Sequence, residues 1–161
     1  MTLTNFWPWL EETSLAQRIG ESWWFPLLES IHVVAIVMVI GSILMVDLRL
    51  IGIAARSYTV SRMSKELVPW TWVAFAISVV TGVGLFITRA AHYVDNIAFQ
   101  AKFVLLILAG INMALFHFGV FRTVNAWDSA TPPSIAKASA ALSLVLWSGV
   151  VLAGRWVGHL S

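Results

Sequence analysis

The chain of 161 residues is 59% hydrophobic and only 11% charged, and its formal net charge is +2. Soluble domains carry roughly 25% charged residues, and a domain of this size leaves much of its surface in water. The composition therefore excludes an ordinary soluble domain and indicates an integral membrane protein. The small net charge and the lack of a basic run exclude a nucleic-acid partner. The chain has no cysteine, which excludes disulfides, thiolate metal sites, iron–sulfur clusters and covalently attached c-type haem.

The first 25 residues precede the first long apolar run. Glu11 and Glu12 stand where a signal peptide carries basic residues, so we expect this start to be retained. Thr13 or Ser14 is placed to cap a short helix whose apolar and charged residues separate onto different sides. We expect residues 1–25 to form an amphipathic segment on the outer membrane surface. The alternative is a loop that becomes ordered only against the helices.

Four apolar runs are each long enough to cross a bilayer, which takes about 20 helical residues. They cover approximately residues 26–53, 69–88, 101–121 and 138–157. The sequence thus predicts one all-α membrane domain, residues 1–161, built as a four-helix bundle in the lipid bilayer. Gly154 and Gly158 are four residues apart, a spacing that allows close helix packing, either within the bundle or in a homo-oligomer.

The basic residues predict the orientation of the four helices. Six of them lie on the side of the first and third connections, and four lie on the other side, where acidic residues dilute them. The six are Arg49, Arg56, Arg62, Lys65, Arg122 and Lys137. Loops rich in Lys and Arg stay in the cytoplasm. We therefore expect a multi-pass protein of the bacterial inner membrane with both termini in the periplasm.

The chain has four histidines, at positions 32, 92, 117 and 159. At 1.5 Å per helical residue, His32 lies about 9 Å below the outer end of the first spanning helix. His92 and His159 follow the outer ends of the second and fourth helices. His117 lies about 24 Å along the third helix, near the cytoplasmic face, where we expect an interface residue. Three histidines are thus free to converge at the outer end, and one is isolated at the inner end.

The outer histidines predict a cofactor site. Neutral imidazole is the commonest protein metal ligand, and ionisable groups inside a membrane are functional by default. A b-type haem between the helices would take His32 as its primary ligand and His159 or His92 as its second. Arg155 and Lys102 are the candidates to position the haem propionates.

Copper or zinc is an alternative occupant of the same end. The ligands would be His32, His92 and His159 together with Glu29, which shares a helix face with His32 at spacing i, i+3. The rival interpretation is that the histidines only satisfy local hydrogen bonds.

No nucleotide-binding loop, zinc-protease motif or nucleophile elbow is present in the sequence. A redox or accessory subunit is therefore expected rather than a stand-alone enzyme. The leading hypothesis is an electron-transfer subunit that serves a periplasmic redox protein or a quinone. The alternatives are a structural or assembly subunit or small carrier without cofactor, and a protein that handles copper or zinc.

Four stretches of the sequence carry a family resemblance, at residues 29–34, 47–52, 69–72 and 102–117. They resemble a family of small uncharacterised bacterial four-helix inner-membrane proteins, and this resemblance implies a fold but no activity. More loosely, a histidine early in the first helix before an apolar, glycine-bearing run is similar to copper-resistance membrane proteins and b561-type cytochromes. The chain lacks the paired histidines that b561 proteins carry at both membrane faces, which speaks against a two-haem path across the membrane.

Overall fold

The computed structural model describes residues 3–128 and 130–159, and every element in these ranges is helical. In chain order the elements are α1 (Leu3–Glu11), α2 (Ser14–Gly20), α3 (Trp24–Ile51), α4 (Val60–Ile87), α5 (Ala90–Asp95), α6 (Ile97–Phe118), the 3-10 helix η1 (Val120–Ala126) and α7 (Ser134–Val157). Four spans are long and apolar enough to cross a membrane, namely α3, α4, α6 continued by η1, and α7. The predicted all-α architecture with four spanning helices is confirmed.

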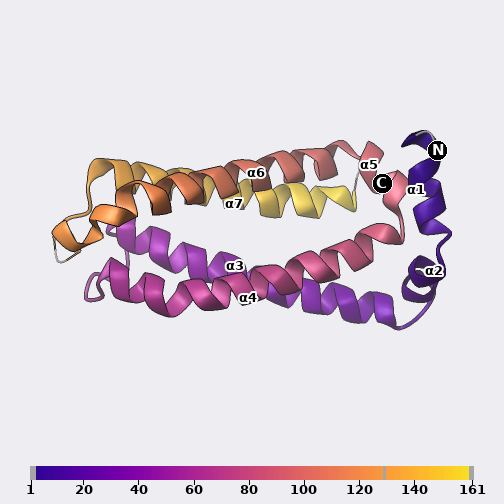
Figure 1. The fold of residues 1–161 in the computed structure, drawn as a ribbon, viewed down its shortest axis with the longest axis horizontal. Coiled ribbons are helices and arrows are strands. Elements are labelled where there is room, and N and C mark those ends of the chain that lie inside the picture. The colour runs from indigo at the N-terminus through magenta and orange to yellow at the C-terminus, as the bar shows by residue number, and fades with distance from the viewer. Residues whose placement is uncertain (1–2, 129, 160–161) are drawn as a thin grey trace.

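The spanning helices are arranged as two antiparallel hairpins (Figure 1). Helix α3 packs along α4, α6 packs along α7, and the hairpins meet chiefly through α3 and α7. The N-terminal helices α1 and α2 lie at one end of the bundle together with α5 and the end of α7, and we call this the terminal end. The α3–α4 connection and η1 lie at the opposite end, which we call the loop end.

The outward faces of the spanning helices are apolar. Val34, Val80 and Val145 are 61%, 71% and 68% exposed, although a soluble protein of this size rarely shows such a continuous apolar surface. Lipid is the solvent that suits these faces. Between helices, small residues allow close approach: a Cβ at Gly149 of α7 would lie 3.1 Å from Cδ1 of Leu105 in α6.

The best-buried apolar cluster lies at the loop end. It joins the ends of all four spanning helices and η1, and consists of Leu50, Val60, Phe116, Val124, Trp127, Ala136 and Ala140. Towards the terminal end, the buried residues include many small or polar ones, such as Ala35, Ser78 and Thr81. The loop end is therefore the packed anchor of the fold, and the terminal half is where polar groups enter the bundle.

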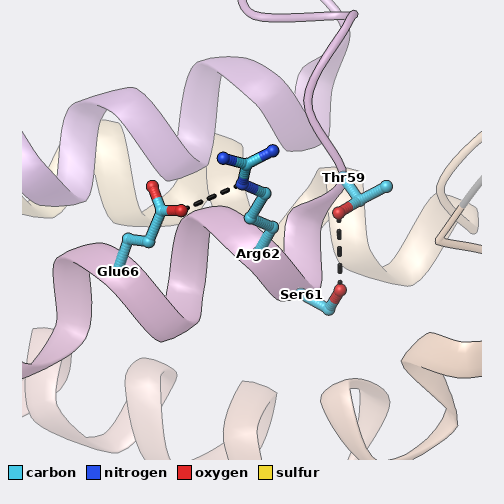
Figure 2. Close-up of polar contacts among 4 residues, drawn as sticks. All are labelled: Thr59, Ser61, Arg62 and Glu66. Atoms are coloured by element: carbon cyan, nitrogen blue, oxygen red, sulfur yellow. Dashed lines mark hydrogen bonds and ion pairs between the residues drawn. The ribbon is translucent and has the colours of Figure 1, made fainter.

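All four spanning helices begin before their predicted apolar runs, and the difference is largest for α4. Helix α4 begins at Val60 rather than near Pro69, and α7 begins at Ser134 rather than near residue 138. Hydropathy marks where lipid-compatible sequence begins, whereas the helix continues through polar turns. In the first turns of α4, Nε of Arg62 lies 2.9 Å from Oε1 of Glu66 (Figure 2). Such an exposed i, i+4 ion pair supports the helical turn only weakly.

The N-terminal segment is held against the terminal end. Helix α2 has Thr13 as its N-cap, and the Thr13 side chain accepts the backbone N–H of Ala16, so the predicted cap is confirmed. Helices α1 and α5 were not expected from the sequence. Oε1 of Glu11 accepts the backbone N–H of Ala91 at 2.7 Å, and this bond ties α1 to α5.

Candidate functional site

His32 lies on the side of α3 that faces α4, about two turns after the helix begins at Trp24. Its Nδ1 is 3.0 Å from Oγ1 of Thr81. Gly82 makes room for the ring, because a Cβ there would lie only 3.0 Å from Cε1 of His32. The half-buried imidazole is therefore held between two helices rather than pointing into lipid.

The hydrogen bonds around Thr81 assign the proton on the imidazole. The Thr81 hydroxyl carries one proton and donates it to the backbone carbonyl of Ile77 at 2.7 Å. Its oxygen must then accept from His32, which places the imidazole proton on Nδ1. The Ser78 backbone also hydrogen-bonds the ring. In this tautomer the lone pair lies on Nε2, the atom through which a neutral imidazole can bind a ligand.

Lys102 is the cation whose charge acts on His32. The end of its side chain rests against α7, where a Cβ at Gly154 would lie 3.8 Å from Nζ. The ammonium interacts electrostatically with the imidazole of His32. Within residues 3–128 and 130–159, no carboxylate pairs with Lys102. A negatively charged group placed between the imidazole and the ammonium would therefore be stabilised by Coulomb attraction.

Arg155 and Glu29, the other charged residues of the predicted site, are exposed at the terminal end. Arg155 lies in the last turn of α7, and the described part of the chain contains no ion pair between it and Glu29. Glu29 acts electrostatically on Tyr93. Of the two predicted propionate partners, Lys102 is thus the one whose charge acts on the imidazole.

His92 and His159 are exposed as well. His92 contacts the ring of Tyr93 with centroids 5.9 Å apart, and His159 contacts Trp156 at 6.3 Å. Among the described residues, neither makes a hydrogen bond or ring contact with His32. In the same residues, no group of three or more His, Cys, Asp or Glu is arranged to hold a metal ion. The structure links His32 and Lys102 by an electrostatic interaction and, in the described residues, does not gather the three histidines into one metal-binding group.

His117 lies at the opposite end of the bundle from His32. Its Nδ1 is 3.2 Å from the backbone carbonyl of Met113 in its own helix, and its ring contacts Phe121 with centroids 5.3 Å apart. These contacts are local, as expected of an interface residue.

An aromatic cluster closes the terminal end above His32 and Lys102. Phe86 stacks on Phe99 with centroids 5.5 Å apart, and Tyr93 stacks on Phe99 at the same distance. Trp7 of α1 adds an edge contact to Phe86. Burial raises the pKa of Tyr93, so its hydroxyl stays protonated at neutral pH. Sequence reasoning missed this cluster because its members come from four different helices.

A buried carboxylate at the loop end was also missed. Asp47 is 7% exposed and hydrogen-bonds Ser143 of α7, while its Oδ2 has no hydrogen-bond partner in the described residues. Nearby, Arg49 donates from Nε to the backbone carbonyl of Tyr58 at 2.6 Å. The charged residues at the end of α3 are therefore buried at the loop end, and each has its hydrogen bond within the fold.

Comparison with known proteins gives a fold family and no activity. No curated protein and no solved structure matches the chain, so no relative supports the looser likeness to copper-resistance proteins or b561-type cytochromes. The model of a family of unknown function, DUF6644, matches residues 6–160, nearly the whole chain. This match agrees with the predicted resemblance to an uncharacterised family. The chain belongs to DUF6644.

Proposed function

We propose that the protein is a membrane-embedded b-haem protein that serves as an electron-transfer subunit. The observation that carries this proposal is the contact of 3.0 Å between Nδ1 of His32 and Thr81, which fixes the ring between two helices and assigns the lone pair to Nε2. Metal-binding histidines usually donate their other ring N–H to an oxygen, which sets the tautomer and the ring orientation. An ionisable side chain held in this way inside a membrane bundle is a functional-site candidate.

Lys102 supplies the second part of the proposed site. When bound, haem would supply an iron that exchanges one electron with a periplasmic redox protein or a quinone. The Lys102 ammonium would attract one propionate, and the exposed Arg155 in the next helix would attract the other. His159 or His92 remains the proposed second ligand. Neither contacts His32 here, so that ligand would come from a rearranged terminal end or from another subunit.

We also propose that the terminal end faces the periplasm and the loop end the cytoplasm of a bacterial inner membrane. Four exposed basic residues support this orientation, since short loops rich in Lys and Arg stay in the cytoplasm. They are Arg56, Arg62, Lys65 and Arg122.

The test is the absorption spectrum of the protein purified in mild detergent, oxidised and then reduced with dithionite. We expect a Soret band that shifts on reduction and disappears in His32→Ala. His117→Ala is the matched control and should keep the band, because within the described part of the chain His117 contacts only its own helix and neighbouring rings. A colourless wild-type protein without bound metal would contradict the proposal.

A second candidate is a structural or assembly subunit, or a small carrier, without cofactor. The hydroxyls of Ser42 and Thr71 also link α3 to α4, at 2.7 Å. The contact of His32 with Thr81 resembles this pair, and such polar contacts between membrane helices can be purely structural. A colourless, metal-free protein that is destabilised by His32→Ala would support this candidate. Elemental analysis of the same sample tests for bound copper or zinc. Since the described residues contain no ready metal-binding group, such a metal would need a further ligand from elsewhere.

A further inference from the structure

A hollow of about 420 Å³ opens at the terminal end, lined by residues from the end of α1, from α2, and from the neighbouring ends of α3 and α4. Helix α2 lies against these ends of α3 and α4, and α1 lies beside α5 (Figure 1). It is separate from the His32 site and independent of the function proposed for it. Charged side chains of both signs line the hollow: Glu11 and Glu21 are acidic and Arg89 is basic, and Phe25 adds an aromatic ring.

The walls of the hollow are fixed by tertiary contacts. Gly20 of α2 lies against the end of α4, because a Cβ there would be 3.6 Å from Cβ of Thr88. Ala16 is only 1% exposed. Glu11 is anchored by the Ala91 N–H at 2.7 Å through one carboxylate oxygen, and its other oxygen accepts no hydrogen bond in the described residues. The hollow is therefore part of the folded terminal end.

The charges in the hollow do not neutralise each other. In the part of the chain that the structure describes, no ion pair within 4.0 Å joins Arg89 to Glu11 or Glu21. A ligand that carries one positive and one negative group could bridge them. A primary ammonium suits two carboxylates, and a phosphate suits a guanidinium, which binds it through paired hydrogen bonds.

The position of the hollow indicates which ligand with both a positive and a negative group would reach it. It lies at the ends of the spanning helices, beside Trp24 at the start of α3, and this is the level of lipid headgroups. A second hollow of about 490 Å³ shares Gln17 and Glu21 with the first and extends it towards Trp24. We propose that the hollow binds a phosphoethanolamine group, with its ammonium at Glu11 and Glu21 and its phosphate at Arg89.

The test is calorimetric titration of the full-length protein in mild detergent with three probes: dihexanoyl-phosphatidylethanolamine, dihexanoyl-phosphatidylglycerol and free O-phosphoethanolamine. We expect the ethanolamine lipid to bind and the glycerol lipid to bind more weakly. Arg89→Gln and Glu21→Gln should each weaken the ethanolamine lipid about tenfold, as loss of a charge-assisted hydrogen bond does. Glu12→Gln and Arg56→Gln are matched controls, since both residues are exposed and neither lines the hollow.

The outcomes separate the sources of the ligand. Equal binding of the free and the acylated ethanolamine would support a soluble phosphoethanolamine as ligand, and binding of the acylated form alone would support a lipid headgroup. Equal binding of the two lipids, no binding of any ethanolamine probe, or unchanged affinity in both Arg89→Gln and Glu21→Gln would overturn the proposal.

Discussion

The carboxylate of Asp128 accepts two hydrogen bonds from Ser61, one from the backbone N–H at 3.0 Å and one from the hydroxyl. Thr59 stands at the N-cap position of α4 but makes no side-chain capping bond to the helix backbone, and its hydroxyl lies 3.5 Å from the Ser61 hydroxyl (Figure 2). Asp128, which follows η1, therefore caps α4 from a distant part of the chain. This contact links the two hairpins at the loop end, where the apolar cluster also lies.

Removing this cap should destabilise the protein. We expect Asp128→Ala to lower the free energy of unfolding by about 1 kcal/mol, the usual cost of losing a helix N-cap. Denaturant unfolding in detergent at pH 7, followed by circular dichroism, measures the change. Asp95→Ala is the control, because Asp95 is exposed and makes no hydrogen bond or ion pair in the described residues. Equal losses in the two variants would contradict a specific capping role.

The same cap predicts a pH dependence. Burial alone would raise the pKa of Asp128, but hydrogen bonds from Ser61 and Val60 and the charge of Arg49 bring it below its ordinary value of 3.8. A carboxyl whose pKa is depressed by folding stabilises the folded state above its unfolded pKa, and this contribution disappears as the pH falls through the folded pKa. The stability difference between wild type and Asp128→Asn should thus be constant from pH 7 to pH 5 and shrink only below about pH 3.8. A difference that shrinks between pH 7 and pH 6 would indicate another titrating group.

Gly82 should be required for the position of the His32 ring. Gly82→Ala would place a Cβ 3.0 Å from Cε1 of His32, and the ring must shift to relieve this contact. We expect a loss of about 1 kcal/mol in the free energy of unfolding. Gly41→Ala is the matched control, since a Cβ there meets nothing within 4 Å and the helix should gain up to about 1 kcal/mol. Similar effects of the two substitutions would show that the ring does not depend on this space.

Asn112 and Ser139 form a reciprocal pair between α6 and α7. Nδ2 of Asn112 donates to the Ser139 backbone carbonyl at 3.0 Å, and the Ser139 hydroxyl donates to Oδ1 of Asn112 at 3.0 Å. Asn112→Ala removes both bonds, whereas Ser139→Ala removes only one. We expect the larger loss from Asn112→Ala and a coupling free energy of about 0.6 kcal/mol in the double-mutant cycle. Ser148→Ala, at an exposed position of the same helix, is the control, and a coupling near zero would contradict the pair.

Much of the fold could be predicted from the sequence, because hydropathy alone determines which segments suit lipid. The starts of α4 and α7 could not, since both helices begin before the apolar stretch. The helical rise of 1.5 Å per residue was enough to place His32 within the first spanning helix. It could not show that Thr81 and Gly82 of α4 surround the ring, because this depends on the register between two helices. The exposed positions of His92 and His159 likewise depend on how α5 and the end of α7 turn.

The unpartnered oxygen of Asp47 predicts that a neutral side chain is preferred at this position. A buried carboxylate costs several kcal/mol unless its oxygens are hydrogen-bonded, and Oδ2 of Asp47 has no partner in the described residues. Asp47→Asn keeps the shape and removes the charge, so we expect the free energy of unfolding to rise by about 1–2 kcal/mol at pH 8. Glu66→Gln is the control and should change stability by less than about 1 kcal/mol, because its ion pair with Arg62 is exposed. A loss of stability in Asp47→Asn would mean that the charge itself is required.

The proposed orientation can be tested directly because the chain has no cysteine. Ser57→Cys places one thiol in the exposed α3–α4 connection at the loop end, and Asp95→Cys places one at the end of α5 at the terminal end. The exposed basic residues near Ser57 should keep this connection in the cytoplasm. A membrane-impermeant maleimide should therefore label Asp95→Cys in intact spheroplasts, and Ser57→Cys only after permeabilisation. The cysteine-free wild type reports background labelling. The reverse pattern would invert the orientation and place the His32 site and the terminal hollow near the cytoplasmic face.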